Sequence, residues 1–199
     1  FAATSYISLG TIKPSSVSIG DFNGDGNQDI ATANYGTDNV SIRLGDGTGG
    51  FTGSTNVTVG NGPQSVAIGD FNNDGIQDFA VANQNFNNGG SVSIRLGDGL
   101  GGFTGSTNIS VGFDSKAVAI GDFNSDGNQD IAVSNPSSNY VSILIGNGAG
   151  VFSTGTNVAV ASGCQSVVIS DFNNDGSQDL AMSNYSTNKV FIKLGNGAG

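Results

Sequence analysis

The sequence of 199 residues lacks histidine, tryptophan and glutamate, and it contains a single cysteine. Histidine and glutamate supply many general acids and bases, so their absence argues against an enzyme, and we predict no catalytic residues. A zinc site would need histidine or several cysteines. Cys164 cannot form a disulfide within the chain, and we interpret it as a small structural residue, the alternative being a reactive thiol.

Basic residues are also scarce, with six Lys and Arg against 16 acidic residues, all of them Asp, for a formal net charge of −10. An acidic chain without a basic cluster repels phosphate backbones, so we expect no nucleic-acid partner. No apolar run approaches the roughly 18 residues that a membrane-spanning helix needs, so we expect no membrane span.

Glycine and asparagine are abundant instead, at 33 and 24 residues. Both favour turns, and the usual helix formers Glu, Lys and Gln are rare. Apolar residues alternate with polar ones in short segments, as in SVSIRLG with Val92, Ile94 and Leu96. This period of two is typical of strands that cover a core. The sequence therefore predicts a folded, all-β protein.

The acidic residues are concentrated in four copies of one motif of nine residues. DFNGDGNQD begins at Asp21, and related segments begin at Asp70, Asp122 and Asp171, with spacings of 49, 52 and 49 residues. Three carboxylates within about 5 Å repel by roughly 3 kcal/mol per pair at an effective dielectric constant near 20. Each cluster therefore needs either open solvation or a bound cation.

Each motif belongs to a repeat with four strand-like segments, and such a unit repeated in series is typical of a β-propeller blade. We predict one domain of four four-stranded antiparallel blades, in repeat units of about 11–60, 61–112, 113–161 and 162–199. Residues 1–10, FAATSYISLG, resemble the fourth-strand segment FTGSTNVTVG, so we expect the N-terminal strand to complete the last blade and close the ring. The alternatives are self-association into an eight-blade ring or filament, and four blades of a larger propeller.

The motif D-x-N-x-D-G-x-Q-D offers side-chain oxygens at positions 1, 3, 5 and 9 and a main-chain carbonyl at position 7. Such oxygen-rich loops suit calcium better than magnesium, which demands a strict octahedron, and glycine at position 6 permits the sharp turn. We predict about one Ca²⁺ per repeat. The alternative is a set of Asx-turns with no ion. The predicted ligands are Asp21, Asn23, Asp25, Asn27, Asp29, Asp70, Asn72, Asp74, Ile76, Asp78, Asp122, Asn124, Asp126, Asn128, Asp130, Asp171, Asn173, Asp175, Ser177 and Asp179.

The segments GDFNNDGIQDFAVAN and SVSIRLGDGLGGF resemble the FG-GAP/VCBS repeat of integrin α-chain propellers and many secreted bacterial proteins. The resemblance extends over essentially the whole chain. It implies a propeller with calcium in the loops between the first and second strands. Propellers of this family usually hold more blades than the four repeats of this chain.

Loops on the side away from the acidic motifs differ between repeats, and variation on a fixed scaffold is where recognition is usually built. We expect a glycan or protein partner there, the alternative being drift in exposed loops. The predicted contact residues are Tyr35, Asp38, Phe86, Tyr140 and Tyr185.

These features together predict a calcium-stabilised binding or adhesion module. The alternative function is a structural spacer in a large surface protein or filament. Calcium loops of this kind can be weak, and extracellular calcium fills even sites with Kd of about 10⁻⁴ M. We therefore expect a secreted or cell-surface location.

Overall fold

The computed structural model describes residues 6–9, 12–85 and 89–199, which form strands joined by turns. None of these residues is helical, so the all-β prediction is confirmed. Within the same residues, no helix is long and apolar enough to cross a membrane.

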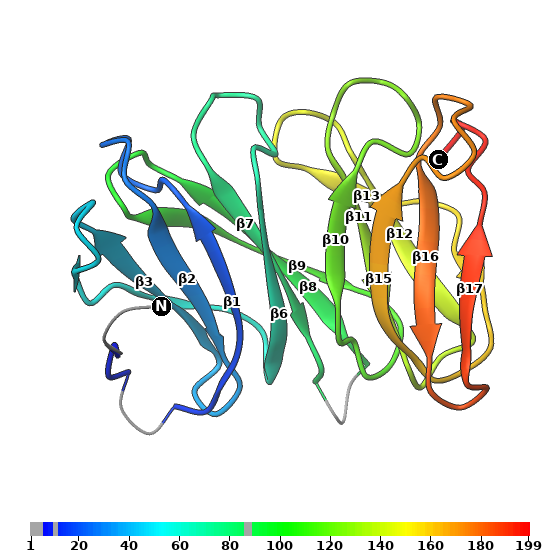
Figure 1. The fold of residues 1–199 in the computed structure, drawn as a ribbon, viewed down its shortest axis with the longest axis horizontal. Coiled ribbons are helices and arrows are strands. Elements are labelled where there is room, and N and C mark those ends of the chain that lie inside the picture. The colour runs from blue at the N-terminus through cyan, green and yellow to red at the C-terminus, as the bar shows by residue number, and fades with distance from the viewer. Residues whose placement is uncertain (1–5, 10–11, 86–88) are drawn as a thin grey trace.

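Four antiparallel sheets follow one another in a row along the chain, and each falls within one sequence repeat (Figure 1). The first contains β1 (Pro14–Gly20), β2 (Asp29–Asn34), β3 (Asn39–Gly45), β4 (Phe51–Thr52) and β5 (Asn56–Thr58). The second contains β6 (Pro63–Gly69), β7 (Asp78–Asn83), β8 (Ser91–Gly97) and β9 (Phe103–Ser110). The third contains β10 (Val118–Gly121), β11 (Asp130–Ser134), β12 (Tyr140–Gly146), β13 (Phe152–Thr154) and β14 (Val158–Ala159). The fourth contains β15 (Cys164–Ser170), β16 (Asp179–Asn184) and β17 (Lys189–Lys193).

Apolar side chains pack between neighbouring sheets and form three separate cores. We call the face that packs on the preceding sheet the leading face, represented in the second sheet by Val66, Phe79 and Val81. The opposite, trailing face packs on the following sheet and is represented in the first sheet by Ala31 and Val40. Small alanines on the trailing face leave room for large side chains such as Phe79, which is fully buried. Burial of each such side chain stabilises the stack by about 1.5–3 kcal/mol.

The first strands of neighbouring sheets, β1, β6, β10 and β15, lie next to one another along the row. Hydroxyl groups connect the first two of these strands: Ser18 Oγ donates to the Val66 carbonyl at 2.7 Å, and Ser15 Oγ donates to the Pro63 carbonyl at 2.7 Å. The first and second sheets are therefore joined by hydrogen bonds between β1 and β6 as well as by apolar packing.

The ends of the row differ from the predicted closed ring. The described part of the fourth sheet has three strands, and Tyr6–Leu9 form no strand. These four residues instead line a cavity together with Val17, Ile30 and Arg43 of the first sheet. The first and fourth sheets lie at opposite ends of the molecule (Figure 1), so Tyr6–Leu9, which lie on the first sheet, do not complete the last one. Residues 1–5, 10 and 11 lie outside the described part of the chain.

The fourth strand is also split in the first and third sheets, where one continuous strand was expected. In the first sheet the break includes Gly53, which has a positive φ of 82°, although Gly105 has a φ of 83° within the continuous strand β9 of the second sheet. The second sheet keeps a single strand, β9, with an irregularity in its register opposite Ile94 and Leu96.

A buried asparagine lies at the end of each second strand, and the residue opposite it determines whether its hydrogen bonds are complete. Asn135 Oδ1 accepts a hydrogen bond from Ser115 Oγ at 2.8 Å. Pro14 and Pro63 occupy the corresponding place opposite Asn34 and Asn83, whose Oδ1 atoms are buried without a partner among the described residues. Proline has no hydroxyl or N–H to donate, which explains the difference.

Replacing Ser115 with alanine should leave Asn135 Oδ1 buried without a donor. We expect the free energy of unfolding to fall by about 1–3 kcal/mol, measured by urea denaturation. Ser153 lies exposed on β13 and provides the control, because Ser153→Ala should change stability by less than about 0.5 kcal/mol. Equal stabilities of the two variants would contradict the assigned role of Ser115.

Candidate functional site

The four acidic motifs form the loops between the first and second strands of each sheet, where the sequence predicted them. The glycine at motif position 6 has a positive φ in every copy, at 83°, 82°, 84° and 86° for Gly26, Gly75, Gly127 and Gly176. A residue with a side chain rarely adopts this conformation. The sharp turn expected at this glycine is confirmed.

The first aspartate of each motif accepts main-chain hydrogen bonds from within its own loop. In the second loop, Asp70 Oδ2 accepts from the Gly75 N–H at 2.9 Å, and Asp70 Oδ1 accepts from the Asp74 N–H at 3.2 Å. The other three loops repeat this pattern within 0.1 Å. These hydrogen bonds shape the loop as the Asx-turn alternative describes.

The side chains at motif positions 3 and 5 contact each other in all four loops. Asn72 Nδ2 donates to Asp74 Oδ2 at 2.8 Å, and the main-chain N–H at position 7 donates to Asp74 Oδ1 at 2.8 Å. In three of the loops these two hydrogen bonds hold the pKa of the carboxyl group at position 5 below its usual value. The main-chain N–H of position 7 has the larger effect. These carboxyl groups are Asp25, Asp126 and Asp175. These three exposed carboxylates therefore stay ionised at neutral pH.

The aspartate at position 9 has a role that the sequence did not reveal. It is fully buried in every copy, and its two oxygens accept hydrogen bonds from two different main-chain N–H groups. Asp78 accepts from Phe71, at the start of the acidic loop, and from Gly97, at the end of β8, both at 2.8 Å. Asp29, Asp130 and Asp179 do the same at 2.7–2.9 Å. We call this arrangement the aspartate clamp.

Burial raises the pKa of Asp78, and the negative charges of Asp74 and Asp70 raise it further, although the two main-chain hydrogen bonds oppose the shift. Burial likewise raises the pKa of Asp130, with the same kind of contribution from its loop. The carboxylates of positions 1, 5 and 9 therefore share one electrostatic environment. A cation in the loop would relieve their repulsion.

The donor atoms of each loop fit a hard divalent cation, because every candidate ligand is an oxygen. Across the described ranges, no three acidic, histidine or cysteine side chains are grouped around a common point. The carboxylates are directed to main-chain N–H groups instead. A carboxylate offers about four lone-pair positions, so an oxygen that accepts one hydrogen bond can still bind a cation. The predicted ligand set stays a prediction.

The glutamine at motif position 8 connects neighbouring loops, a second role that the sequence did not reveal. Gln77 Oε1, in the second sheet, accepts a hydrogen bond from the Asp21 N–H of the first sheet at 2.8 Å. The pairs Gln129 with Asp70 and Gln178 with Asp122 repeat this contact at 3.0 and 2.7 Å. The invariance of glutamine within the four motifs was the available signal.

On the opposite side of the sheets, Tyr35 and Asp38 both contact Gly62, whereas Tyr140 and Tyr185 belong to the third and fourth sheets. Asp38 accepts hydrogen bonds from the Gly62 N–H at 2.8 Å and from Asn61 Nδ2 at 3.4 Å, so it holds the neighbouring loop. The Tyr35 ring lies against Gly62 as well. Tyr140 is half-buried at the start of β12, whereas Tyr185 is 67% exposed. Phe86 lies outside the described residues.

A cavity of about 330 Å³ on this side is lined by residues that the sequence analysis missed: Gln84, Asn85, Phe113, Asp114 and Ser137. Phe113 is 59% exposed. Gln84 donates a hydrogen bond to Asp114, and Ser137 Oγ donates to the same carboxylate at 3.3 Å. The variable loop FDSK, which carries Phe113 and Asp114, was the signal in the sequence.

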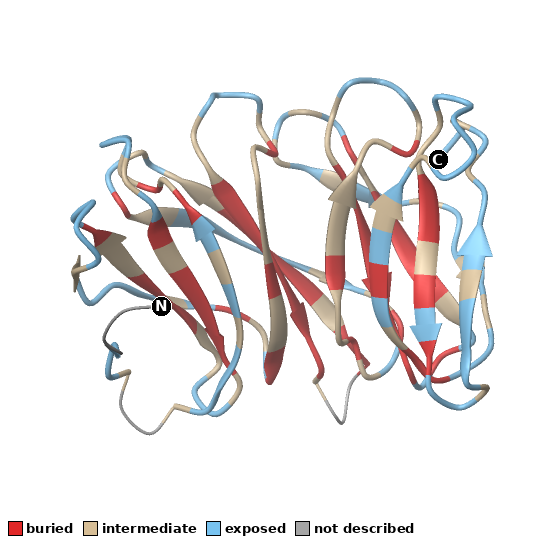
Figure 2. Cartoon of the chain, viewed as in Figure 1, coloured by how far each residue is buried: buried red, intermediate tan, exposed pale blue. Residues whose placement is uncertain are grey.

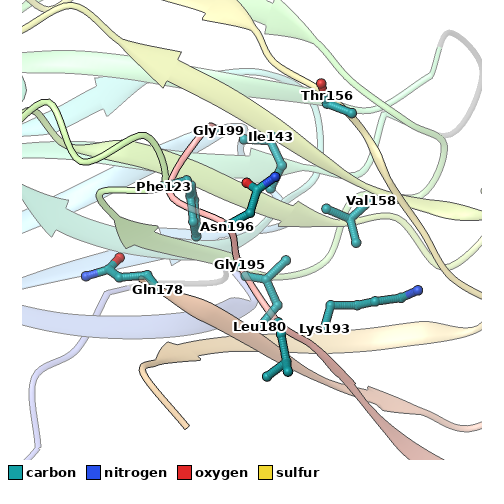
Figure 3. A pocket seen from close by; sticks show the side chains of 11 residues that line it. Phe123, Ile143, Thr156, Val158, Gln178, Leu180, Lys193, Gly195, Asn196 and Gly199 are labelled. Carbon is teal, nitrogen blue, oxygen red and sulfur yellow. The ribbon is translucent and has the colours of Figure 1, made fainter. Parts of the chain in front are cut away.

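Another cavity, of about 270 Å³, lies between the third and fourth sheets (Figure 3). Its lining is mainly apolar and includes Phe123, Ile143 and Leu180, with Gly195 and Gly199 of the C-terminal turn. The buried Cys164 belongs to the core between the same two sheets, and burial raises the pKa of its thiol to about 11. Such a thiol is poorly reactive, in line with the structural interpretation.

Comparisons with known proteins identify the repeat and the fold. The family model described as FG-GAP-like repeat matches residues 21–81, 70–133 and 122–182. Two similar solved structures are crystals of BBS1N in complex with ARL6DN, one soaked with lead and one with mercury. Their sequence identities are 14% and 12%, their TM-scores are 0.55 and 0.62, and both alignments cover 94% of this chain. The chain spans only 57% and 60% of BBS1N, and the likeness shows the fold alone. No curated protein matches the sequence.

Two variants of the second loop can separate the contribution of the aspartate clamp to stability from the contribution of ion binding. In EDTA we expect Asp78→Asn to lower the free energy of unfolding by about 1–3 kcal/mol, because an amide can accept only one of the two main-chain hydrogen bonds. Asp74→Asn removes an exposed carboxylate of the same loop and should cost less than about 0.5 kcal/mol in EDTA. Urea denaturation of both variants measures the difference, and equal losses would contradict the clamp.

Proposed function

The chain belongs to the FG-GAP-like repeat family, and on this premise we propose that it is a calcium-stabilised β-propeller module that binds a glycan or protein partner outside the cell. We propose no catalytic activity for it. The observation that carries the proposal is the recurrence of one loop, with the same oxygen donors and the same hydrogen bonds, in all four sheets.

Calcium would be held by the side chains at motif positions 1, 3, 5 and 9 and by the carbonyl at position 7. In the second loop these are Asp70, Asn72, Asp74, Asp78 and Ile76. The ion would supply positive charge among carboxylates that repel one another, and it would thereby stabilise the turn. Four divalent ions would change the formal charge of the chain from −10 to −2.

The variable side of the sheets supports a binding role. Its cavity combines an exposed aromatic ring, Phe113, with the amides of Gln84 and Asn85 and the carboxylate of Asp114. An aromatic face with nearby amide and carboxylate groups suits a sugar ring or a polar peptide. BBS1N was crystallised in a complex with ARL6DN, which supports a protein partner as the second ligand class.

The proposed extracellular location follows from the chemistry of the loops. Weak calcium sites are filled at millimolar calcium, and a ligand that binds only the folded state stabilises it by mass action.

The alternative function, a spacer in a longer surface array, is favoured by one observation. Apolar side chains are exposed at both ends of the row of sheets (Figure 2), as expected of repeats that continue into neighbours.

Thermal unfolding with calcium, magnesium or EDTA tests the stabilising role of the ion. A site filled at one hundred times its Kd contributes about 2.7 kcal/mol, and each kcal/mol shifts Tm by about 2–4 °C in a chain of this size. With four sites, we expect Tm to fall by more than about 10 °C in EDTA and to recover with calcium more than with magnesium. An unchanged Tm in EDTA would leave the loops as plain Asx-turns.

The cavity at Phe113 can be tested by screening the protein on a glycan array in millimolar calcium. We expect the wild type to bind at least one glycan class and Phe113→Ala to lose most of the signal, because the aromatic face is removed. Leu100→Ala, which alters an exposed turn of the second sheet outside the cavity lining, should retain binding. Equal signals from both variants would exclude this cavity as the glycan site.

A further inference from the structure

The two ends of the row expose the residues that are buried at every junction between sheets. The valine of the third strand is fully buried in the first three sheets but 66% exposed in the fourth, as Val190. On the first strand, the corresponding valine is 63% exposed in the first sheet, as Val17, and at most 9% exposed in the later ones. The last sheet therefore presents a trailing face without a partner, and the first sheet presents a leading face without one.

Two hydrogen bonds recur at each of the three junctions. The first and the fourth sheet each carry one partner of both bonds. One joins the motif glutamine to the first aspartate of the preceding loop. The other runs from a turn glycine to the second motif residue of the preceding loop: Gly101 to Phe22, Gly150 to Phe71 and Gly199 to Phe123, at 2.9, 2.8 and 3.0 Å. In the first sheet the equivalent residues are Gln28 and Gly49, and in the last they are Asp171 and Phe172. Among described residues none of these four makes the corresponding contact.

Among the described residues, the third junction has no aromatic pair equivalent to those at the first two junctions. At the first two junctions, Phe103 packs edge-on against Phe22 and Phe152 packs edge-on against Phe71, with ring centroids 5.6 and 5.4 Å apart. Both rings come from the fourth strand of the following sheet. At the third junction that strand is absent from the described part of the fourth sheet, and Phe123 faces the cavity instead (Figure 3).

The N-terminal segment has the sequence of the missing strand. FAATSYISLG aligns with FTGSTNVTVG, so Ile7 corresponds to Val57, which pairs with Val40 in the first sheet. The equivalent pair in the last sheet would be Ile7 with Val190, on the free edge of β17. Tyr6–Leu9 lie on the first sheet, at the other end of the row (Figure 1), so this pairing requires a second molecule.

We propose that copies of this chain associate head to tail. The leading face of the first sheet in one copy packs on the trailing face of the fourth sheet in another. Tyr6–Leu9 of the first copy lie along β17 of the second as part of its fourth strand. A contact between two different surfaces either closes into a ring or continues into a filament, and two copies would place eight sheets in one assembly. This inference does not depend on glycan binding or on calcium.

One residue makes the contact between copies looser than the junctions within the chain. Gly20, Gly69 and Gly121 each lie directly against the side chain of the bridging glutamine, where a Cβ atom would overlap its carbonyl oxygen. The fourth sheet has Ser170 at this position. Gln28 of the neighbouring copy must therefore shift, and Ser170→Gly should strengthen the association.

Light scattering and sedimentation of the full chain, in millimolar calcium and in EDTA, test the proposal. We expect a mass at least twice the 19.9 kDa of one chain at micromolar concentrations in calcium. Val17→Asp and Val190→Asp should each remain at the mass of one chain. Leu100→Asp introduces the same charge at an exposed apolar residue away from both faces, and it should associate as the wild type does. A wild type that is monomeric throughout would overturn the inference.

Mixing the variants tests the head-to-tail arrangement. Val17→Asp keeps an intact trailing face and Val190→Asp keeps an intact leading face, so an equimolar mixture should form a one-to-one complex. Persistent self-association of either variant alone would mean that identical faces pair, and this would overturn the proposal. We expect Ser170→Gly to lower the Kd several-fold while its Tm shows that the chain is folded. An unchanged Kd would contradict the placement of Gln28.

Discussion

A buried carboxylate at motif position 9 holds each sheet together at the side where the acidic loops lie. Burying an ionised group without partners is costly, and in all four copies two main-chain N–H groups offset that cost. Because one N–H belongs to the acidic loop and the other lies at the end of the third strand, the clamp joins three strands at one point. The loop, the hairpin and the edge of the sheet therefore depend on the same side chain.

The neighbouring glutamine extends this arrangement from one sheet to the next. Gln77 directly precedes Asp78 at the start of β7, but its side chain points toward the preceding sheet, where Oε1 accepts a hydrogen bond from the Asp21 N–H. A single motif of nine residues thus fixes its own turn, positions the adjacent loop and presents oxygen atoms to solvent. Because one motif has all three roles, it varies little among the four copies, whereas the loops at the other end of the strands differ in length and composition.

Sequence patterns predicted the features that depend on local periodicity. The alternation of Val92, Ile94 and Leu96 identified a strand, and the spacing of the motifs identified four units. The role of Asp78 could not be read in this way, because a carboxylate that accepts main-chain hydrogen bonds looks the same in sequence as one that binds a cation. The Phe113 cavity was missed for another reason: its lining combines Gln84 with Ser137, from loops of different sheets, and depends on how the sheets stack.

Repeats that bury their faces only against neighbours need capping at the ends of the array, and terminal repeats usually carry polar residues for this purpose. The first and last sheets of this chain keep the apolar pattern of the inner ones: Ile19 is 63% exposed and Ile192 is 50% exposed. Two residues on the trailing face of the fourth sheet, Val168 and Ser170, differ from their equivalents in the other sheets. They change the shape of this face but do not make it polar enough to cap the array. A second copy packed on this face, as in the proposed head-to-tail association, would cover both Val190 and Ile192.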